Sequence, residues 1–428
     1  HFFSPRFGFA WSPWGAGAKT VIRGGFGVFV TPIGVNGIIQ PGFSQSTPFL
    51  PTLDGYLTVN ATLSNPFPGG FLHPSGSSQG LSTYLGQGVS FYNPSPVNPY
   101  SMRWDLDIER QFGQNVVFEI GYQGSHAIHL TDNQSLDYVP GQYLSTLPFR
   151  DNATINLLSA NVASPFHNLI PGVGISGSTV HVSQLLLPYP QFTGVTEDGV
   201  NDFSSFFDML SMRLEKRFSN GLQLLANYSY SRLMSYTTRL NAQDPSPENY
   251  VDSIDHPHRV VVSGRYGLPF GKGRHFAAGA GPLVDRVIGG WITNFIYTYE
   301  TGGPLGWGNV IYLGGPLNID PHNPNHTFNT APFDRNPNDQ LSDNLRTFPP
   351  RFSNLRSDNT NNVDFSVIKD IPIHERLTLE FRAEFFNFFN HPLFNGPNLS
   401  PTSPSFGTIP NGPANLPRTT QLALRLMW

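Results

Sequence analysis

The chain is dominated by segments in which apolar and polar residues alternate with a period of two, over about ten residues each. Such alternation is typical of β-strands, because successive side chains of a strand point to opposite faces of the sheet. About eleven such segments can be recognised, which predicts an all-β chain. The expected strands are 3–11, 20–30, 101–112, 115–130, 205–218, 222–234, 259–268, 289–301, 363–371, 377–390 and 418–428.

The gaps between these segments are alternately short and long, and this rhythm restricts the fold further. Asn220 and Gly221 form a two-residue gap typical of tight β-hairpins, whereas long loops rich in Pro, Gly and Ser occupy roughly 31–100, 131–204 and 302–361. A barrel inserted from the periplasm keeps the turns on that side short, while its other rim can carry long loops. A soluble sandwich has no reason to alternate loop length so regularly. The rhythm therefore favours an antiparallel up-and-down transmembrane β-barrel.

The two faces of the clearest strands differ in chemistry. In 377–389 one parity is almost entirely apolar, whereas the other carries carboxylates and an arginine. Charges of both signs can pair around an aqueous lumen, but an arginine at the centre of the lipid face costs about 2–4 kcal/mol. Lys216 and Lys369 fall on the apolar parity near strand ends, where they can reach the polar membrane surface. The charged residues that this parity places toward the lumen are Arg103, Asp105, Asp107, Glu109, Arg213, Glu215, Glu380, Arg382, Glu384 and Arg425.

Composition supports β-structure but leaves a soluble alternative open. Charged residues make up 13% of the chain, about half the usual share for a soluble globular protein. The 43 Gly and 39 Pro argue against long helices, and aromatic residues cluster at strand ends, as in the girdles of a barrel. A soluble β-sandwich also alternates apolar and polar residues, so a secreted β-rich binding protein stays open as an alternative.

Several classes of protein are excluded or disfavoured by simple counts. The net charge is −4 and no basic stretch occurs, which argues against nucleic acid as a partner. The absence of cysteine excludes a disulfide framework, cysteine-ligated zinc and thiol catalysis. No apolar run is long enough to predict a transmembrane helix. Because strand-like sequence follows His1 directly, we expect the start of the natural protein to lie upstream.

Motifs that resemble catalytic or metal sites are weak. Asp255, His256 and His258 offer suitable ligands, but a metal site needs three or four that converge, and only a loop pair is evident. The stretch 267–272 lacks the spacing of a phosphate-binding loop and is interpreted as a periplasmic turn. The paired carboxylates share a face with arginines, which favours charge pairing over acid–base catalysis. We therefore predict no enzyme activity, no cofactor and no metal.

The long loops and the last strand supply further candidate residues. Aromatic and amide-rich runs in the loops suit a sugar or a peptide, although they equally suit loops that pack on one another. The ligand candidates in these loops are Tyr92, Tyr189, Phe192 and Trp307. The chain ends with alternate apolar residues and a terminal aromatic residue, a pattern typical of the signal that directs outer-membrane barrels to the barrel-assembly machinery. The residues of this signal are Leu424, Leu426 and Trp428.

A set of short segments, spread in order over nearly the whole chain, points to one family. The segments are 3–11, 19–27, 98–104, 120–126, 214–222, 228–231, 258–259, 267–273, 289–291 and 376–394. Together they resemble TonB-dependent outer-membrane receptors of the Oar-like type. The most specific part is 381–387 followed by 389–392, and Trp428 is a departure because Phe is more usual there.

This resemblance implies a barrel of about 22 strands, of which residues 1–428 would hold the C-terminal half. It also implies a plug, and often a carboxypeptidase-regulatory-like domain, upstream of His1, where the TonB–ExbB–ExbD complex would bind. Eleven strands cannot close an antiparallel barrel, so we expect an open half-barrel with two free edges when the chain is alone.

The leading hypothesis is therefore a receptor barrel of the bacterial outer membrane, surrounded by lipid, that admits a scarce solute. A carbohydrate or a peptide is the favoured class of solute. Two alternatives remain: a surface or adhesion protein without a transport role, and the secreted soluble binding protein.

Overall fold

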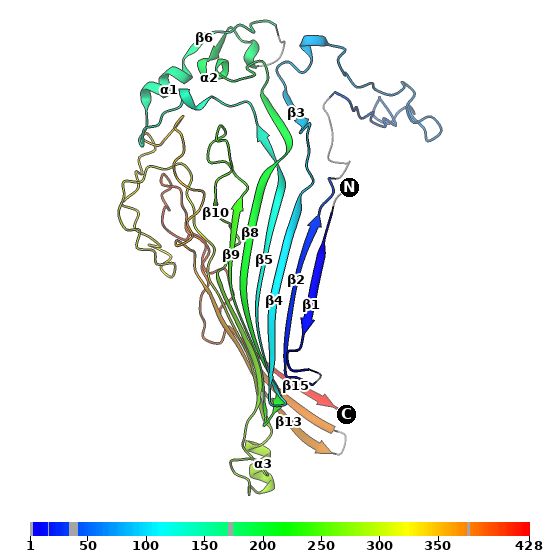
Figure 1. The fold of residues 1–428 in the computed structure, drawn as a ribbon, viewed down its shortest axis with the longest axis vertical. Helices are drawn as coiled ribbons and strands as arrows, with labels where there is room; N and C mark the ends of the chain where they lie inside the picture. The colour runs from blue at the N-terminus through cyan, green and yellow to red at the C-terminus, as the bar shows by residue number, and fades with distance from the viewer. Residues whose placement is uncertain (1–2, 16, 34–41, 170–173, 375–376) are drawn as a thin grey trace.

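One curved sheet of 13 strands forms the wall of the molecule (Figure 1). The structure is a computed structural model and describes residues 3–15, 17–33, 42–169, 174–374 and 377–428. Eleven strands follow one another across the sheet in chain order, while β3 (Gly88–Tyr92) pairs with β8 and β10 (Tyr250–Val251) pairs with β9. The eleven are β1 (Arg6–Trp11), β2 (Thr20–Val30), β4 (Tyr100–Phe112), β5 (Val116–Ser135), β8 (Gly194–Ser219), β9 (Leu222–Tyr236), β11 (His258–Gly267), β12 (Trp291–Glu300), β13 (Thr360–His374), β14 (Leu377–Phe386) and β15 (Thr419–Met427).

The strand order confirms the predicted topology. All ten neighbouring pairs along this path are antiparallel. The path begins with β1 at one edge and ends with β15 at the other, so the sheet is open. The expectation of eleven up-and-down strands in an open half-barrel is therefore confirmed.

Short elements occupy the connections at the two ends of the sheet (Figure 1). Two of them, α1 and α2, lie beyond the end that carries the long loops, whereas α3 lies at the opposite end. No helix in the described part of the chain is both long and apolar enough to cross a membrane. The elements are α1 (Asn152–Ser159), α2 (Val182–Leu185), α3 (Pro282–Ile288), β6 (Asn161–Ala163), β7 (Thr179–His181) and the 3-10 turns η2 (Gly80–Ser82), η3 (Gly141–Tyr143) and η4 (Gly174–Ser176).

Two strands are much longer than the alternation predicts. β5 has 20 residues and β8 has 26, and their upper parts pair with each other above the rest of the sheet. Three register shifts interrupt this upper pairing between Ile128 and Gln134, and His129 within it has a positive φ of 58°. Each shift moves side chains to the other face and breaks the period of two. The sequence-based prediction therefore ended β5 too early, at residue 130, and began β8 too late, at residue 205.

Other strand ends differ by a few residues. β1 begins at Arg6 rather than at residue 3, and β14 ends at Phe386 rather than at residue 390. Asn387 and Asn390 have positive φ angles of 49° and 56°, which start a turn and end the pairing. β13 continues to His374, past the expected end at 371, and residues 375–376 of the expected turn lie outside the described residues.

The end of the sheet opposite the long loops carries mostly tight turns. Asn220 and Gly221 have φ angles of 50° and 78°, as a two-residue hairpin with both central residues at positive φ requires. The connection 268–290 is longer and contains α3, an element that the sequence analysis did not predict. Pro282 occupies the first turn of α3, where its fixed φ and missing N–H are tolerated.

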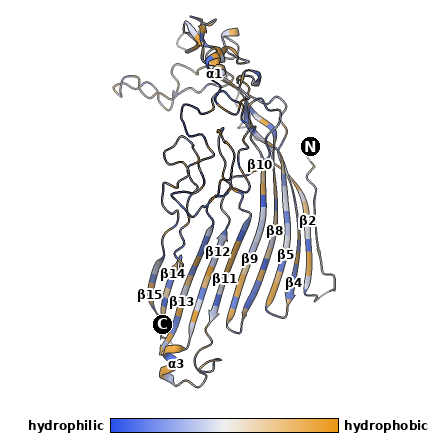
Figure 2. Cartoon of the chain, turned by 90° about the vertical axis from the view of Figure 1, so that its left-hand side faces the viewer, coloured by the Kyte–Doolittle hydropathy of each residue, from blue (hydrophilic) through white to orange (hydrophobic). Residues whose placement is uncertain are grey.

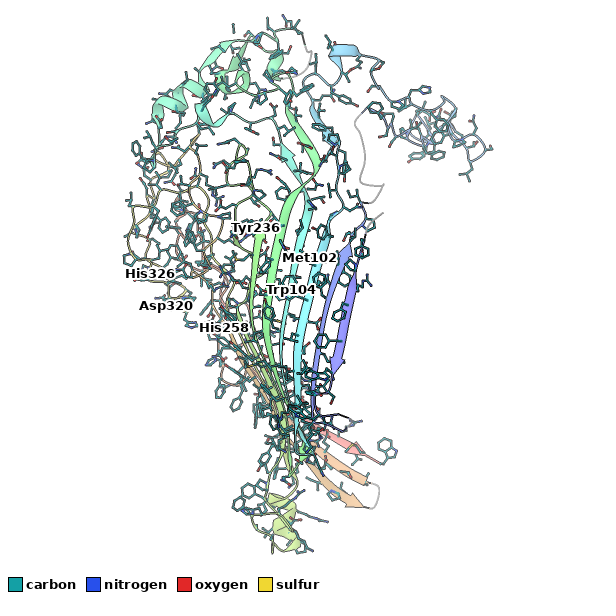
Figure 3. The ribbon with its side chains drawn as sticks, in the orientation of Figure 1. Met102, Trp104, Tyr236, His258, Asp320 and His326 are labelled. Atoms are coloured by element: carbon teal, nitrogen blue, oxygen red, sulfur yellow. The ribbon has the colours of Figure 1, made fainter. Side chains whose placement is uncertain are left out.

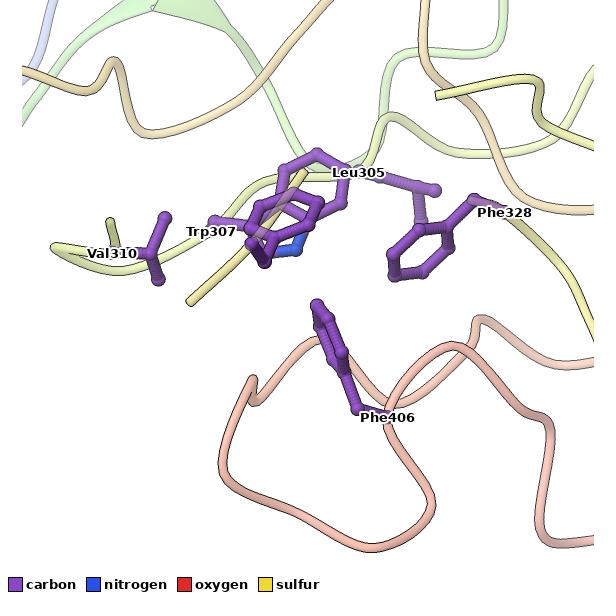
Figure 4. Packing of buried hydrophobic residues seen from close by; sticks show 6 residues of the cluster. Leu305, Trp307, Val310, Phe328 and Phe406 are labelled. Carbon is purple, nitrogen blue, oxygen red and sulfur yellow. The ribbon is translucent and has the colours of Figure 1, made fainter. Parts of the chain in front are cut away.

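A hydrophobic core lies in the long loops (Figure 4). We call residues 302–359 and 387–418, which pack around it, the outer loop cluster. Phe328 is fully buried at its centre, and the ring of Phe406 meets it edge-on at 5.2 Å between centroids. The loop cluster is therefore folded in the manner of a small soluble domain. The core residues are Leu305, Trp307, Val310, Phe328, Phe333 and Phe406.

Candidate functional site

The strand register sorts the side chains of the sheet onto two chemically different faces. Ile108 lies opposite Ile120, which in turn lies opposite Met212, so this parity forms an apolar row across β4, β5 and β8. The adjacent row, one residue along each strand, contains Glu109, Glu119 and Arg213. Figure 2 shows the same alternation along the strands as blue and orange bands. The predicted division into an apolar and a charged face is thus continuous across neighbouring strands.

Among the described residues, no protein layer covers the apolar face. Leu424 on β15 is 70% exposed, and Leu422 on the same strand and Leu106 on β4 are also exposed. In water, such a continuous apolar surface over a whole sheet would be strongly unfavourable. Hydrocarbon is the environment that removes this cost.

Aromatic side chains form a band on the apolar face toward the long loops. The Phe206 ring lies 6.1 Å from Trp104 and 5.6 Å from His126, between ring centroids. Farther along the sheet, the Tyr228 hydroxyl is 3.0 Å from Nδ1 of His258. Figure 3 labels Trp104 and His258 on their strands. Amphipathic rings at this level are typical of the membrane–water interface of a barrel.

The charged face contains several ion pairs. Arg213 reaches Glu215 at 2.7 Å and Glu119 at 3.9 Å. Arg382 lies between Glu380 at 3.2 Å and Glu384 at 3.6 Å, all on β14. These predicted charges therefore meet on one face, where a wet lumen would keep them hydrated.

The other predicted lumen charges lie on the same face with different neighbours. Asp107 is opposite Arg23 in the register, and Arg425 is opposite Glu380. The guanidinium of Arg103 lies over the Phe29 ring, 5.1 Å from its centroid. Asp105 has the same parity as Asp107 and Arg103 on β4, and Glu109 pairs with Arg23 at 3.3 Å.

Sequence reasoning missed several members of this face. The further members are Arg23, Glu119, Arg259 and Glu300. Arg259 and Glu300 pair at 3.2 Å across β11 and β12. The signal that could have found them is the alternation within their own strands, because each is a neighbour of residues of the other face, as Glu119 is of Phe118 and Ile120.

Charged residues on the apolar face are compensated locally. The Lys216 ammonium donates to the Ser219 carbonyl and hydroxyl at the tight turn, as its position near the strand end predicted. Asp208 and Arg232 lie opposite each other higher up, where Asp208 accepts a hydrogen bond from the Tyr122 hydroxyl. Asp208 and Arg232 lie beside the aromatic band and not at the middle of the membrane-spanning strands. The sequence analysis did not identify this pair.

The loop residues chosen as ligand candidates lie in different places. Tyr92 on β3 lines a cavity of about 590 Å³ beside Asp198 and Gly199. Tyr189 is exposed and its backbone N–H donates to the Asp137 carboxylate at 3.1 Å. Burial raises the pKa of Asp137 above its usual value.

Two of these candidates are held inside the loops. Phe192 is half-buried at the end of the turn 189–192, where its backbone N–H donates to the Tyr189 carbonyl. Trp307 is only 2% exposed, which favours the alternative that loop aromatics pack on one another. The Phe328, Phe333 and Phe352 rings pack around it because the outer loop cluster uses it as core. A cavity of about 440 Å³ adjoins it within the cluster.

The Asp255 motif connects loops to each other. The Asp255 carboxylate is buried, accepts the Leu233 backbone N–H at 2.7 Å, and pairs with Arg356 at 2.6 Å. Arg356 also donates to the carbonyls of Asp255 and Gly302. His258 stacks with the tyrosines of β9 instead of turning toward Asp255. Asp255 and Arg356 therefore connect β9 and the segment before β11 to the outer loop cluster.

The last strand has the geometry expected of the terminal signal. Leu424 lies opposite Phe381 and Leu426 lies opposite Leu379, so both belong to the apolar face. Trp428 follows the end of β15 and is almost fully exposed.

A family model and several solved structures resemble this chain. Residues 1–421 match the family model described as an outer membrane beta barrel domain. No curated protein matches the chain. Similar solved structures include the outer membrane transporter YddB from Escherichia coli (11% identity, TM-score 0.43), with coverage of 99% of this chain and 40% of that one.

Two further solved structures have lower identity. The ferripyoverdine receptor of Pseudomonas aeruginosa is 9% identical (TM-score 0.40; 99% of this chain, 32% of that one). The FrpB iron transporter from Neisseria meningitidis is also 9% identical (TM-score 0.40; 99% and 38%). The chain thus spans less than half the length of these proteins. By its family match over residues 1–421, this chain belongs to the outer membrane β-barrel domain family of bacterial outer-membrane proteins.

Proposed function

We propose that the chain is the C-terminal part of a TonB-dependent outer-membrane receptor that takes up a solute. The observation that carries this proposal is the charged inner face, on which Arg213 and Arg382 each pair with two carboxylates. A lumen lined by paired charges is hydrated and can pass polar molecules. The segments that resemble Oar-like receptors support the TonB-dependent mechanism, in which the TonB–ExbB–ExbD complex would act on a region upstream of His1.

A carbohydrate or a peptide is the class of solute that we propose. Tyr189 and Tyr92 offer aromatic surfaces in the outer loops, and Tyr92 lines a cavity together with Asn133 and Asp198. Aromatic rings beside amide and carboxylate groups can stack on a sugar and hydrogen-bond to hydroxyls or amides. Trp307 is not part of this proposal, because it is enclosed in the loop core.

Uptake measurements test this proposal. Cells that express the full-length protein should accumulate labelled oligosaccharides or peptides from a panel, and deletion of TonB should abolish this accumulation. Tyr92→Ala should reduce uptake of the accepted solute, whereas Val97→Ala, an exposed residue of the same loop, should not. Accumulation that persists without TonB would contradict the mechanism, and equal uptake by both variants would contradict the proposed site.

A surface role without transport is the second candidate, and the size of the outer structure favours it. β5 and β8 extend beyond the sheet and carry α1, α2 and β3 with them. Cell attachment that is lost with the protein but unaffected by deletion of TonB would favour this role over uptake. The soluble alternative is set aside, because the chain belongs to an outer-membrane family and its apolar face is uncovered.

A further inference from the structure

The connection that contains α3 continues the lipid-facing surface of the barrel. Lys369 and Trp291 are direct partners in the register of β13 and β12, on the parity that continues through Phe381 to Leu424. The Lys369 ammonium donates to the Val287 carbonyl at 3.1 Å and to the Gly289 carbonyl at 2.6 Å. The C-terminal end of α3 is therefore docked on the outer face of the wall and not in the lumen.

The docking removes the charge of Lys369 from the apolar surface. Its side chain is buried, and its ammonium lies 4.9 Å from the centroid of the Trp291 ring. The Trp291 indole N–H donates to the Val287 carbonyl at 2.8 Å. A cation at the C-terminal carbonyls of a helix is favourable, because the helix dipole is negative there. Lys369 thus fixes the position of α3 relative to the lipid.

The exposed face of α3 is apolar. Leu283 is 80% exposed and Val287 is 69% exposed, and Val284 beside them is exposed as well. Positions 283, 284 and 287 share one side of a helix. Asp285 points the other way, into the loop, where it accepts the Lys272 backbone N–H at 2.6 Å. The loop is therefore built to present this apolar side outward.

Basic side chains accompany this apolar face. Lys272, Arg274 and Arg286 are exposed in the connection 268–290, where Asp285 is held in the hydrogen bond to Lys272. An apolar helix face flanked by lysine and arginine is typical of helices that lie in the interface of a membrane. Anionic headgroups attract such basic clusters over about a Debye length.

We propose that α3 is a membrane-surface anchor that lies among the phospholipid headgroups of the periplasmic leaflet. Leu283, Val284 and Val287 enter the acyl boundary, and the basic residues contact anionic phosphates. This inference rests on the barrel's place in the outer membrane, so it stands or fails independently of solute uptake.

Spin labels at single cysteines test the anchor, because the chain has no cysteine of its own. The labelled variants of the full-length protein are Leu283→Cys, Val287→Cys, Arg286→Cys and, in the tight turn 113–115, Gln114→Cys. In vesicles of phosphatidylethanolamine and phosphatidylglycerol, collisions with oxygen report lipid and collisions with a water-soluble nickel complex report water. The ratio of oxygen to nickel accessibility should be several-fold higher at 283 and 287 than at 114 and 286.

The same measurement distinguishes lipid from water or protein as the material that covers the apolar face of α3. High accessibility to nickel at 283 and 287, equal to that at 114, would mean that water covers the helix and would overturn the proposal. Shielding from both reagents would mean that protein covers it, and would overturn the proposal as well. Omission of phosphatidylglycerol should lower the ratio at 283, and the double variant Lys272→Gln/Arg274→Gln should lose this lipid dependence. A ratio indifferent to phosphatidylglycerol would remove the anionic headgroup from the proposal.

Discussion

The membrane-spanning strands and the outer loop cluster place their apolar side chains in opposite environments. Leu424 on β15 is 70% exposed, whereas Phe328 in the loops is fully buried among aromatic rings. The strands need no protein layer on their apolar face, because lipid takes the place of that layer. The loops stand in water and must bury their own apolar residues against one another. The same residue types therefore act as surface in one region and as core in the other.

The comparison also explains where polar groups are placed. In the sheet, charged residues gather on one face and remain partly hydrated, as Arg213 does. In the loops, the Asp255 carboxylate is buried and is matched by Arg356 and by the backbone N–H of Leu233. A buried charge in a core requires such partners, whereas a charge in a wet lumen does not.

The largest expected loss of stability comes from a substitution in the core of the outer loop cluster. Phe328→Ala removes a fully buried ring and should lower the local stability of the cluster by about 3–5 kcal/mol. Leu313→Ala, at an exposed position of the same loop, should change it by less than about 0.5 kcal/mol. Protease cleavage within 302–359 on intact cells measures both. Equal cleavage of the two variants would mean that the cluster is not a core.

The next effect distinguishes the two faces of one strand. Ile120→Arg places a cation on the apolar row of β5 and should destabilise the barrel by about 2–4 kcal/mol. Gln123→Arg, on the charged face of the same strand and opposite Asp105, should have little effect. Urea unfolding of the full-length protein in lipid vesicles provides the comparison. The assignment of the faces would be reversed if Gln123→Arg proved the more harmful change.

A smaller effect concerns α1 at the top of the outer structure. The Asp151 side chain caps the N-terminus of α1. The hydrogen bond from the Thr154 hydroxyl is the largest of the contributions that hold the pKa of Asp151 below its usual value. Because the pKa of Asp151 is lower in the folded than in the unfolded protein, its stabilisation of α1 is complete above about pH 5. This stabilisation is lost as the pH falls below the ordinary aspartate pKa near 3.9 and then through the folded pKa. The protection of the amides of 152–159 from hydrogen exchange, relative to the intrinsic exchange rate at each pH, should fall on acidification, and Asp151→Ala should show low protection at all pH values. Protection that is independent of pH in the unchanged protein would contradict this role.

The smallest effect concerns the ion pairs of the lumen. Arg213 and Glu215 are both partly exposed, and such pairs couple by about 0.2–1 kcal/mol. A double-mutant cycle with Arg213→Ala and Glu215→Ala should give a value in this range that falls with added salt. A coupling of several kcal/mol would show that this face is dry, and the contrast with the buried Asp255 pair would disappear.

Much of the sheet could be predicted from sequence, because a one-sided environment imposes a period of two on every strand. Lys216 and Glu380 were placed on the correct faces by parity alone. The loop core could not be predicted in this way, since Trp307 and Phe406 are far apart in sequence and follow no period. The upper parts of β5 and β8 were missed for a related reason, because their register shifts interrupt the period of two.

The length of β8 has a consequence for the reach of the sheet. With 26 residues at about 3.3 Å each, β8 measures roughly 85 Å, far more than a membrane is thick. The same strand carries Arg213 on the charged face and Glu197 beside β3 in the outer structure. One continuous element therefore joins the membrane-spanning wall to the outermost part of the molecule, and the register shifts near His129 lie between the two.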